Sequence, residues 1–295
     1  MVARSEIDVL TPQTLDEALG LLRKNEAGLK IVAGGSDVIV QLRDGIIKTN
    51  TLLNILSLRE LRFIKRIDDR VHVGALSTYS DIINNENIQK HGWVLAEAAK
   101  QIGAVQLQNT ATIGGNLGNA SPAGDSLPPL YALDATVVAR SLSNRREFPI
   151  EDFFIGYRKT ALTNDELIEQ IYFNALGPTD RGAYVKLGLR EANAISIVDV
   201  AVVLKGRKAD NSFEDIRIAM GAIAPVIVRA RRCEQELIRK PLTIDLIQRA
   251  SSLALADSAP IDDIRGSAEY RKSVLVSLVF RALHRAALEE TESHE

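Results

Sequence analysis

The chain has 295 residues, 46% of them hydrophobic and 25% charged, which is enough for two or three globular units with cores of their own. Its formal net charge is −2 with acids and bases interspersed, which excludes an extended basic surface for nucleic acid or an anionic membrane. The longest apolar run, residues 195–204, is too short and too polar to cross a membrane, and no secretory segment opens the chain, so we expect a cytoplasmic protein.

The first predicted elements make a small lobe of one helix and several strands. Thr14 and Glu17 have the spacing of a capping box before an apolar stripe, which predicts a helix over residues 15–23. Two apolar runs, residues 30–33 and 51–55, then predict strands. We therefore expect a first lobe of residues 1–57, with one helix covering a small sheet.

A second lobe is predicted from two hairpins and the segments around them. Asp68-Asp69-Arg70 separates two strand-like runs, and residues 94–102 have helical periodicity. Further apolar runs predict a second hairpin of residues 135–140 and 146–150, and a strand over residues 166–173. Because a turn-rich segment follows at 176–180, we end this lobe at residue 177 and assign it residues 58–177.

The remaining part, residues 178–295, is predicted to place its strands before its helices. The strand candidates are residues 183–189, 195–205 and 216–223. The helix candidates are residues 226–238, 243–256 and 268–288. This order indicates an α+β domain with a three-stranded sheet covered by helices.

Two paired-glycine segments, residues 33–37 and 112–116, are the candidates for a phosphate site. Glycine leaves backbone N–H groups unscreened and permits left-handed dihedrals, so two such turns can hold a diphosphate from both sides. Each turn alone is more typical of an ordinary tight turn, because glycine is the usual turn residue. The chain has neither G-x-G-x-x-G nor G-x-x-x-x-G-K-[ST], which disfavours a Rossmann or P-loop nucleotide site.

Other candidate chemistry is sparse. Asp125 is the only acid in residues 106–125, and it suits either hydrogen bonds from sugar or ribityl hydroxyls or the cap of a turn. The single cysteine, Cys233, can neither form an internal disulfide nor hold an iron–sulfur cluster alone. The four histidines lack metal-binding spacing, so we predict no metal site in this chain. We also predict no catalytic side chain.

Four segments taken together resemble one protein family. AGGSD at 33–37, TIGGN at 112–116, ASPAGDSLP at 120–128 and YVKL at 184–187 resemble the FAD-binding medium subunit of the xanthine dehydrogenase and carbon monoxide dehydrogenase family of molybdenum hydroxylases. Order, spacing and chain length all fit. The resemblance implies an α+β fold with a two-part FAD-binding unit of the vanillyl-alcohol oxidase type. It also implies a C-terminal domain of three antiparallel strands and helices, as in the carbon monoxide dehydrogenase flavoprotein.

The resemblance also implies which residues contact FAD. One side of the diphosphate is expected at Lys30, Ile31, Val32, Ala33, Gly34, Gly35, Ser36 and Asp37. The other side is expected at Ala111, Thr112, Ile113, Gly114, Gly115 and Asn116. Asp125 is expected at the nucleotide chain, and the backbone of Leu167 at the adenine. Tyr184 is expected near the ring system and Lys186 near the flavin, where a cation favours the anionic reduced form; otherwise Lys186 is a surface lysine at a strand edge.

The implied function is electron transfer in a heterotrimer. A large subunit with the molybdenum cofactor oxidises the substrate, a small subunit with [2Fe-2S] clusters conducts the electrons, and FAD on this chain passes them to an external acceptor, with NAD expected before quinones or oxygen. The alternatives are a stand-alone FAD oxidase of the vanillyl-alcohol oxidase type and a FAD-free scaffold subunit. The oxidase would need a substrate pocket of its own, whereas only 5% of residues are aromatic and no aromatic cage is evident.

Overall fold

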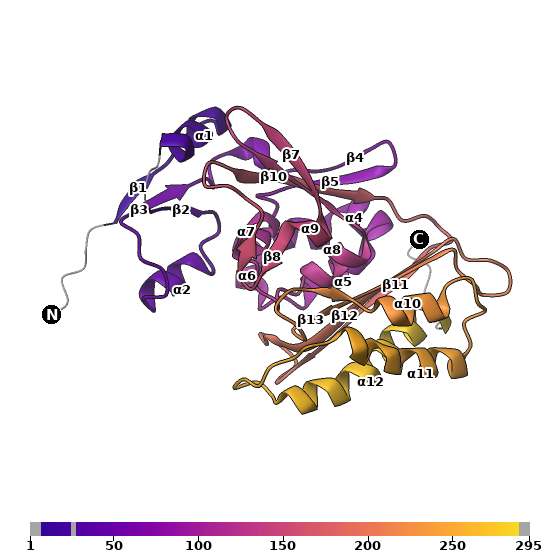
Figure 1. Cartoon of the computed structure of the whole chain (residues 1–295). Coiled ribbons are helices and arrows are strands. Elements are labelled where there is room, and N and C mark those ends of the chain that lie inside the picture. The colour runs from indigo at the N-terminus through magenta and orange to yellow at the C-terminus, as the bar shows by residue number, and fades with distance from the viewer. Residues whose placement is uncertain (1–6, 25–27, 289–295) are drawn as a thin grey trace.

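The computed structural model describes residues 7–24 and 28–288. Figure 1 shows a small N-terminal lobe, a central lobe and a C-terminal sheet backed by helices. Within the described residues, buried apolar side chains form three clusters, one mainly for each of these parts. The predicted boundaries after residues 57 and 177 fall between secondary-structure elements and remain predictions.

The first lobe is a parallel three-stranded sheet with the order β1-β3-β2, covered by a helix. Its elements are β1 (Asp8–Leu10), α1 (Leu15–Lys24), β2 (Leu29–Val32), α2 (Val38–Arg43) and β3 (Thr51–Asn54). The apolar stripe of α1 is buried as predicted. Only half of the capping box forms, because Thr14 Oγ1 accepts from the N–H of Glu17, whereas the Glu17 carboxylate accepts from Gln13.

The central lobe contains an antiparallel five-stranded sheet with the order β4-β5-β10-β6-β7. Both predicted hairpins and the strand after them are confirmed. The strands are β4 (Ile64–Ile67), β5 (Arg70–Gly74), β6 (Thr136–Arg140), β7 (Arg145–Pro149) and β10 (Leu167–Asn174), and a small hairpin is made by β8 (Phe154–Gly156) and β9 (Lys159–Thr160). At the first hairpin Asp68 adopts a left-handed φ of 51°.

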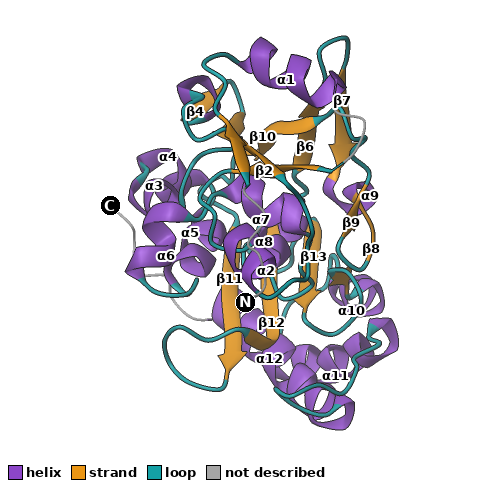
Figure 2. Cartoon of the chain, turned by 90° about the vertical axis from the view of Figure 1, so that its left-hand side faces the viewer, coloured by secondary structure: helices purple, strands orange, loops and turns teal. Residues whose placement is uncertain are grey.

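Helices cover one face of this sheet. They are the 3₁₀ turn η1 (Arg59–Leu61), α3 (Tyr79–Asn84), α4 (Glu86–His91), α5 (Trp93–Lys100), α6 (Val105–Thr110), α7 (Ile113–Asn119), α8 (Leu127–Ala132) and α9 (Ile150–Phe153). In Figure 2, α3 to α6 gather on one side of the central lobe and the β8–β9 hairpin lies on the other. The helix predicted over residues 94–102 is confirmed as α5.

The C-terminal part has an antiparallel sheet with the order β11-β12-β13-β14. Its strands are β11 (Arg181–Gly188), β12 (Ser196–Lys205), β13 (Asp215–Gly221) and β14 (Val228–Arg229), followed by α10 (Arg231–Leu237), α11 (Ile244–Leu253), η2 (Ala254–Asp257) and α12 (Ala268–Leu288). The three predicted strands are confirmed. A two-residue fourth strand is added, because Val228 and Arg229 pair with β13, and the helix predicted from residue 226 therefore begins at Arg231.

This sheet is buried on both faces. Tyr184, Ala201, Val203 and Ala219 belong to the core of the central lobe. The alternate residues of the same strands pack with α10, α11 and α12 in a separate core. Figure 1 shows the sheet between α5 and α8 on one side and α10 to α12 on the other. Such an arrangement explains why every residue of β12 except Lys205 is buried, and hence why this strand is apolar apart from Ser196, Asp199 and Lys205.

Across residues 7–24 and 28–288, no helix combines the length and the apolarity needed to cross a membrane.

Candidate functional site

The first glycine segment is the turn between β2 and α2. Gly35 has a left-handed φ of 72°, a conformation that glycine adopts without strain. In the described part of the chain, the backbone N–H groups of residues 34–37 donate to no protein acceptor. Consecutive free amides around a left-handed residue form a concave set of donors, which is the arrangement that binds anionic oxygens.

The first glycine segment packs against the end of α6, which directly precedes the second segment. A Cβ atom built on Gly34 would lie 1.7 Å from the carbonyl oxygen of Thr110, so only glycine fits between the first lobe and the end of α6. Next to this contact, Gln41 Nε2 of α2 donates to Asn119 Oδ1 of α7 over 2.9 Å. The first lobe is thus fixed against the region that holds the second segment.

The second glycine segment is not a turn, which corrects the interpretation from sequence. Residues 113–119 form α7, and Thr112 is its N-cap, with Oγ1 accepting from Gly115 N over 3.1 Å. Ile113 N donates to Ser77 O over 3.0 Å, and Gly114 N donates to Ala75 O over 2.9 Å. These amides are therefore occupied by protein acceptors and are not free for a phosphate.

Close packing explains the glycine at position 114. A Cβ on Gly114 would lie 2.6 Å from Ala75 Cβ and 2.7 Å from Ala75 O, so glycine lets α7 sit directly on the end of β5. Asn116 completes the segment through its side chain, whose Oδ1 accepts from Ser126 Oγ over 2.8 Å. Gly115 is exposed and Thr112 is buried.

The other residues expected at the diphosphate and adenine lie in β2 and the turn after it, directly before α7, and at the start of β10. Lys30 and Asp37 are exposed, Val32 is buried, and Ile31, Ala33, Ser36 and Ala111 are partly buried. Leu167 is the first residue of β10, and its buried side chain joins the core of the first lobe. It thereby links the first lobe to the central sheet.

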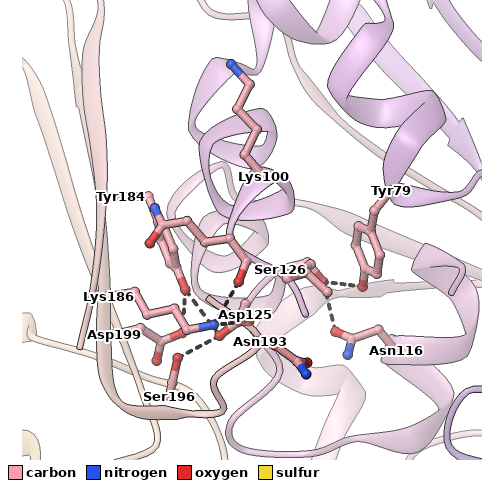
Figure 3. Close-up of polar contacts among 12 residues, drawn as sticks. Tyr79, Lys100, Asn116, Asp125, Ser126, Tyr184, Lys186, Asn193, Ser196 and Asp199 are labelled. Carbon is pink, nitrogen blue, oxygen red and sulfur yellow. Dashed lines mark hydrogen bonds and ion pairs between the residues drawn. The ribbon is translucent and has the colours of Figure 1, made fainter. Parts of the chain in front are cut away.

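A polar cluster is built around Asp125, just before α8. Lys186 Nζ lies 2.6 Å from Asp125 Oδ2, and both side chains are less than a tenth exposed. Ser196 Oγ donates to Asp125 Oδ1 over 2.6 Å, while Lys186 also donates to Gln101 O over 3.0 Å. Figure 3 shows these side chains converging on Asp125. Asp125 is therefore not a turn cap, and Lys186 is not a surface lysine but half of a buried ion pair.

Tyr184 extends this cluster to a residue that sequence reasoning missed, Asp199. The Tyr184 hydroxyl lies 2.9 Å from Asp199 Oδ2 and 3.4 Å from Asp125 Oδ1, and both Tyr184 and Asp199 are fully buried. The only signal in the sequence was an acid in the otherwise apolar run 195–204. In the sheet, Asp199 pairs in register with Lys186 on one side and Gly221 on the other.

The burial of this cluster shifts its acid–base equilibria. Burial raises the pKa of Asp199, and the neighbouring Asp125 charge raises it further. Burial also raises the pKa of Asp125, although Lys186 opposes that shift. Asp125 is the one that touches the ammonium, so we assign the negative charge to Asp125. Burial raises the pKa of Tyr184 well above its usual range, so its hydroxyl keeps its proton.

Two hollows border the cluster at the edge of β11. One, of about 350 Å³, lies between Lys186 and the α12 residues Phe280, Arg281 and Arg285. The other, of about 320 Å³, lies between Lys186 and the loop of residues 187–194. Lys186 and Gln101 line both hollows, so these two residues connect the buried cluster to accessible space.

Within residues 7–24 and 28–288, no group of three or more histidine, cysteine, aspartate or glutamate side chains is arranged to hold a metal ion. Cys233 is buried, and its burial raises the pKa of its thiol far above the usual range. A buried and protonated thiol is neither a nucleophile nor a ligand.

Comparisons with known proteins agree along the whole chain. Residues 5–173 match the family model of the FAD-binding domain in molybdopterin dehydrogenase, and residues 183–286 match the carbon monoxide dehydrogenase flavoprotein C-terminal domain. The nicotinate dehydrogenase FAD-subunit of Eubacterium barkeri is 31% identical over 97% of this chain and 98% of its own length. The glyceraldehyde dehydrogenase medium chain of Sulfolobus acidocaldarius is 33% identical over 96% of this chain and 99% of its own. A carbon monoxide dehydrogenase structure from Hydrogenophaga pseudoflava superposes with a TM-score of 0.91 at 30% identity, covering 96% of this chain and 97% of that one.

Proposed function

Because this chain belongs to the family of FAD-binding medium subunits of xanthine dehydrogenase and carbon monoxide dehydrogenase, we propose that it is the FAD-carrying electron-transfer subunit of a multi-subunit molybdenum hydroxylase. It is an oxidoreductase subunit, and its fold is that of the carbon monoxide dehydrogenase flavoprotein. The single observation that supports the FAD assignment best is the set of unpaired amides at residues 34–37, in a turn that Gly34 holds directly against the backbone of Thr110.

The chemistry of the donor set fits a dinucleotide. The free amides of the first glycine segment would hold the diphosphate, while Ser36 adds a hydroxyl and Asn116 a side-chain amide. Since the amides of Ile113, Gly114 and Gly115 are used inside the protein, the first lobe would supply the backbone donors and the second segment would supply packing and side chains. When bound, FAD supplies the chemistry of taking up electrons singly and releasing them as a pair.

The chain's own contribution is binding and electrostatics. Lys186 is held by Asp125 at the border of both hollows, where its ammonium favours negative charge on a bound ring system. Tyr184 is held by its hydrogen bonds with Asp199 and Asp125 and lines the hollow next to α12. No side chain here needs to act as a general base, because the cofactor carries the reaction.

We place the partners in other chains. The lone Cys233 cannot bind an iron–sulfur cluster, which supports a separate small subunit with [2Fe-2S] clusters and a large subunit with the molybdenum cofactor. The relatives include a carbon monoxide dehydrogenase medium chain from Hydrogenophaga pseudoflava, whose name indicates such a division. We propose NAD as the external acceptor and the cytoplasm as the location of the complex.

The experiment is an absorbance spectrum of the chain alone and of the complex purified from its host, with iron and molybdenum determined in both. We expect flavin bands in the isolated chain, and iron and molybdenum only in the complex. NADH added without oxygen should bleach the flavin bands; persistence of these bands would exclude NAD. A colourless chain that takes up no FAD would support the scaffold alternative, and turnover of an organic substrate by the chain alone would support the oxidase.

A further inference from the structure

Asp199 lies inside the C-terminal sheet beside Lys186, its in-register neighbour on β11, whose ammonium is paired with Asp125 instead. Its side chain is fully buried, and Oδ1 has no hydrogen-bond partner in the part of the chain that the structure describes. A Cβ on Gly221, its neighbour on β13, would lie 2.1 Å from Asp199 Oδ1, so that glycine leaves the room for this carboxyl group. An ionised carboxylate in such a place is strongly disfavoured unless it is paired.

The one ammonium nearby is already engaged. Lys186 Nζ is 2.6 Å from Asp125 Oδ2 and 3.0 Å from Gln101 O, and Ser196 also donates to Asp125. The cluster therefore contains two carboxyl groups and one cation. If both carboxyl groups were ionised, the buried cluster would carry an uncompensated negative charge.

A proton on Asp199 Oδ2 supplies a separate hydrogen for each of the two hydrogen bonds that involve the Tyr184 hydroxyl, whereas Oδ1 stays without a partner among the described residues. The protonated Oδ2 would donate to the Tyr184 oxygen over 2.9 Å, and the Tyr184 hydroxyl would then donate to Asp125 Oδ1 over 3.4 Å. If Asp199 were ionised, the single hydroxyl hydrogen of Tyr184 would serve Asp199, and Asp125 would lose that donor. The burial of Asp199 and the charge of Asp125 raise the pKa of Asp199 to about 8, in the same direction as this geometry.

Two other charged side chains near the cluster, those of Glu97 and Arg271, contact backbone groups of the sheet. Glu97 of α5 accepts from the backbone N–H of Tyr184. Arg271 of α12 donates to the carbonyls of Ile197 and Ala222 on the opposite side of the sheet. Glu97 and Arg271 thus contact the backbone of the sheet, whereas the Asp199 carboxyl group is hydrogen-bonded to the Tyr184 hydroxyl, with Ser196 and Lys186 beside it.

We propose that Asp199 is a positioning residue that holds a proton at neutral pH and, through the Tyr184 hydroxyl, leaves Asp125 as the one carboxylate paired with Lys186. Its consequence for the flavin rests on the proposed function. Lys186 borders both hollows, and a second negative charge behind it would offset the positive charge that it presents to a bound ring system. A neutral Asp199 therefore preserves the field of Lys186.

The test is carbon NMR of the FAD-free chain labelled at its aspartate carboxyl groups, titrated from about pH 5 to about pH 9. We expect one carboxyl signal with a midpoint near pH 8, absent in Asp199→Asn and retained in the control Asp69→Asn, whose side chain is 99% exposed. Should Asp199→Asn not fold, Tyr184→Phe identifies the signal by shifting its midpoint. If every aspartate titrates below about pH 6, or if the late signal persists in Asp199→Asn, the proposal is overturned.

A second readout is the flavin potential of the FAD-loaded chain. As pH rises past the Asp199 midpoint, the midpoint potential should fall more steeply in the wild type than in Asp199→Asn. Identical curves would overturn the link to the flavin. Because the NMR titration needs no FAD, a chain that binds no FAD would refute the proposed function while the proton on Asp199 is judged independently.

Discussion

Replacing Gly34 with alanine tests whether the contact between the first glycine segment and the end of α6 is needed for FAD binding. The added Cβ would lie 1.7 Å from Thr110 O, whereas ordinary contacts begin at 3.4 Å, so the gap must open by 1.7 Å, the difference of these two distances. The obstacle is backbone at the end of α6 and cannot rotate away. Overpacking of this kind costs about 1–3 kcal/mol.

This cost falls on the arrangement that brings the first lobe against α6 and α7. If FAD binds only to that arrangement, its dissociation constant should rise roughly 5- to 150-fold, since about 1.4 kcal/mol corresponds to a factor of ten. The assay is titration of the apo chain with FAD, followed by flavin fluorescence. Far-UV circular dichroism verifies that the fold is retained.

Gly20→Ala is the matched control in the same lobe. Nothing lies within 4 Å of a Cβ at Gly20, which is inside α1, so alanine should stabilise the helix by about 0.5–1 kcal/mol and leave FAD binding unchanged. Wild-type FAD affinity in Gly34→Ala would refute a role of the contact between Gly34 and Thr110 in FAD binding. An equal loss in Gly20→Ala would show that the assay reports lobe stability instead.

Three further predictions concern stability. Lys186→Met leaves the buried Asp125 without its cation and should lower the free energy of unfolding, measured by urea titration, by about 3–5 kcal/mol. Adding Asp125→Asn to this variant should restore part of the loss. An unchanged urea midpoint in Lys186→Met would contradict a buried ion pair. Although burial raises the pKa of Asp263, hydrogen bonding from Arg265 and Arg271 outweighs it and lowers this pKa to about 2. The resulting stabilisation is present above the unfolded pKa of 3.8 and is lost as pH falls through about 2, so Asp263→Asn should flatten the acid limb of a plot of melting temperature against pH. An acid limb as steep as that of the wild type would contradict this role of Asp263. Gly114→Val should destabilise the central lobe by at least about 1–3 kcal/mol, because the side chain would meet Ala75; loss of FAD with an unchanged urea midpoint would instead favour a direct role for Gly114 at the ligand.

Local patterns predicted the elements whose burial is periodic. The stripe of α1, the apolar run of β12 and the helix over residues 268–288 are all visible in the sequence because one face or both faces of each are buried. β14 was missed since two residues give no period, and only pairing with β13 makes them a strand.

The structure of the second glycine segment could not be predicted from local sequence, for a different reason. Two adjacent glycines favour a turn, and the helix α7 forms there because Thr112 caps it and Gly114 packs on Ala75, a contact between distant parts of the chain. Asp125 was singled out as the one acid in its segment and Lys186 through the resemblance, but the pairing of the two was not predicted. Asp199 had no motif, and its role depends on the register of β12 against β11 and β13.

The sheet between the two larger cores limits how the chain can be divided. A fragment ending near residue 177 would expose the central-lobe core where Tyr184, Ala201 and Ala219 now cover it, and the remaining piece would lose the cover of one sheet face. The two larger parts should therefore melt together and be inherited together. The core of the first lobe also contains Leu61, Leu76 and Leu167 of the central lobe, so the first lobe, which carries the amides of residues 34–37, depends on the central lobe as well.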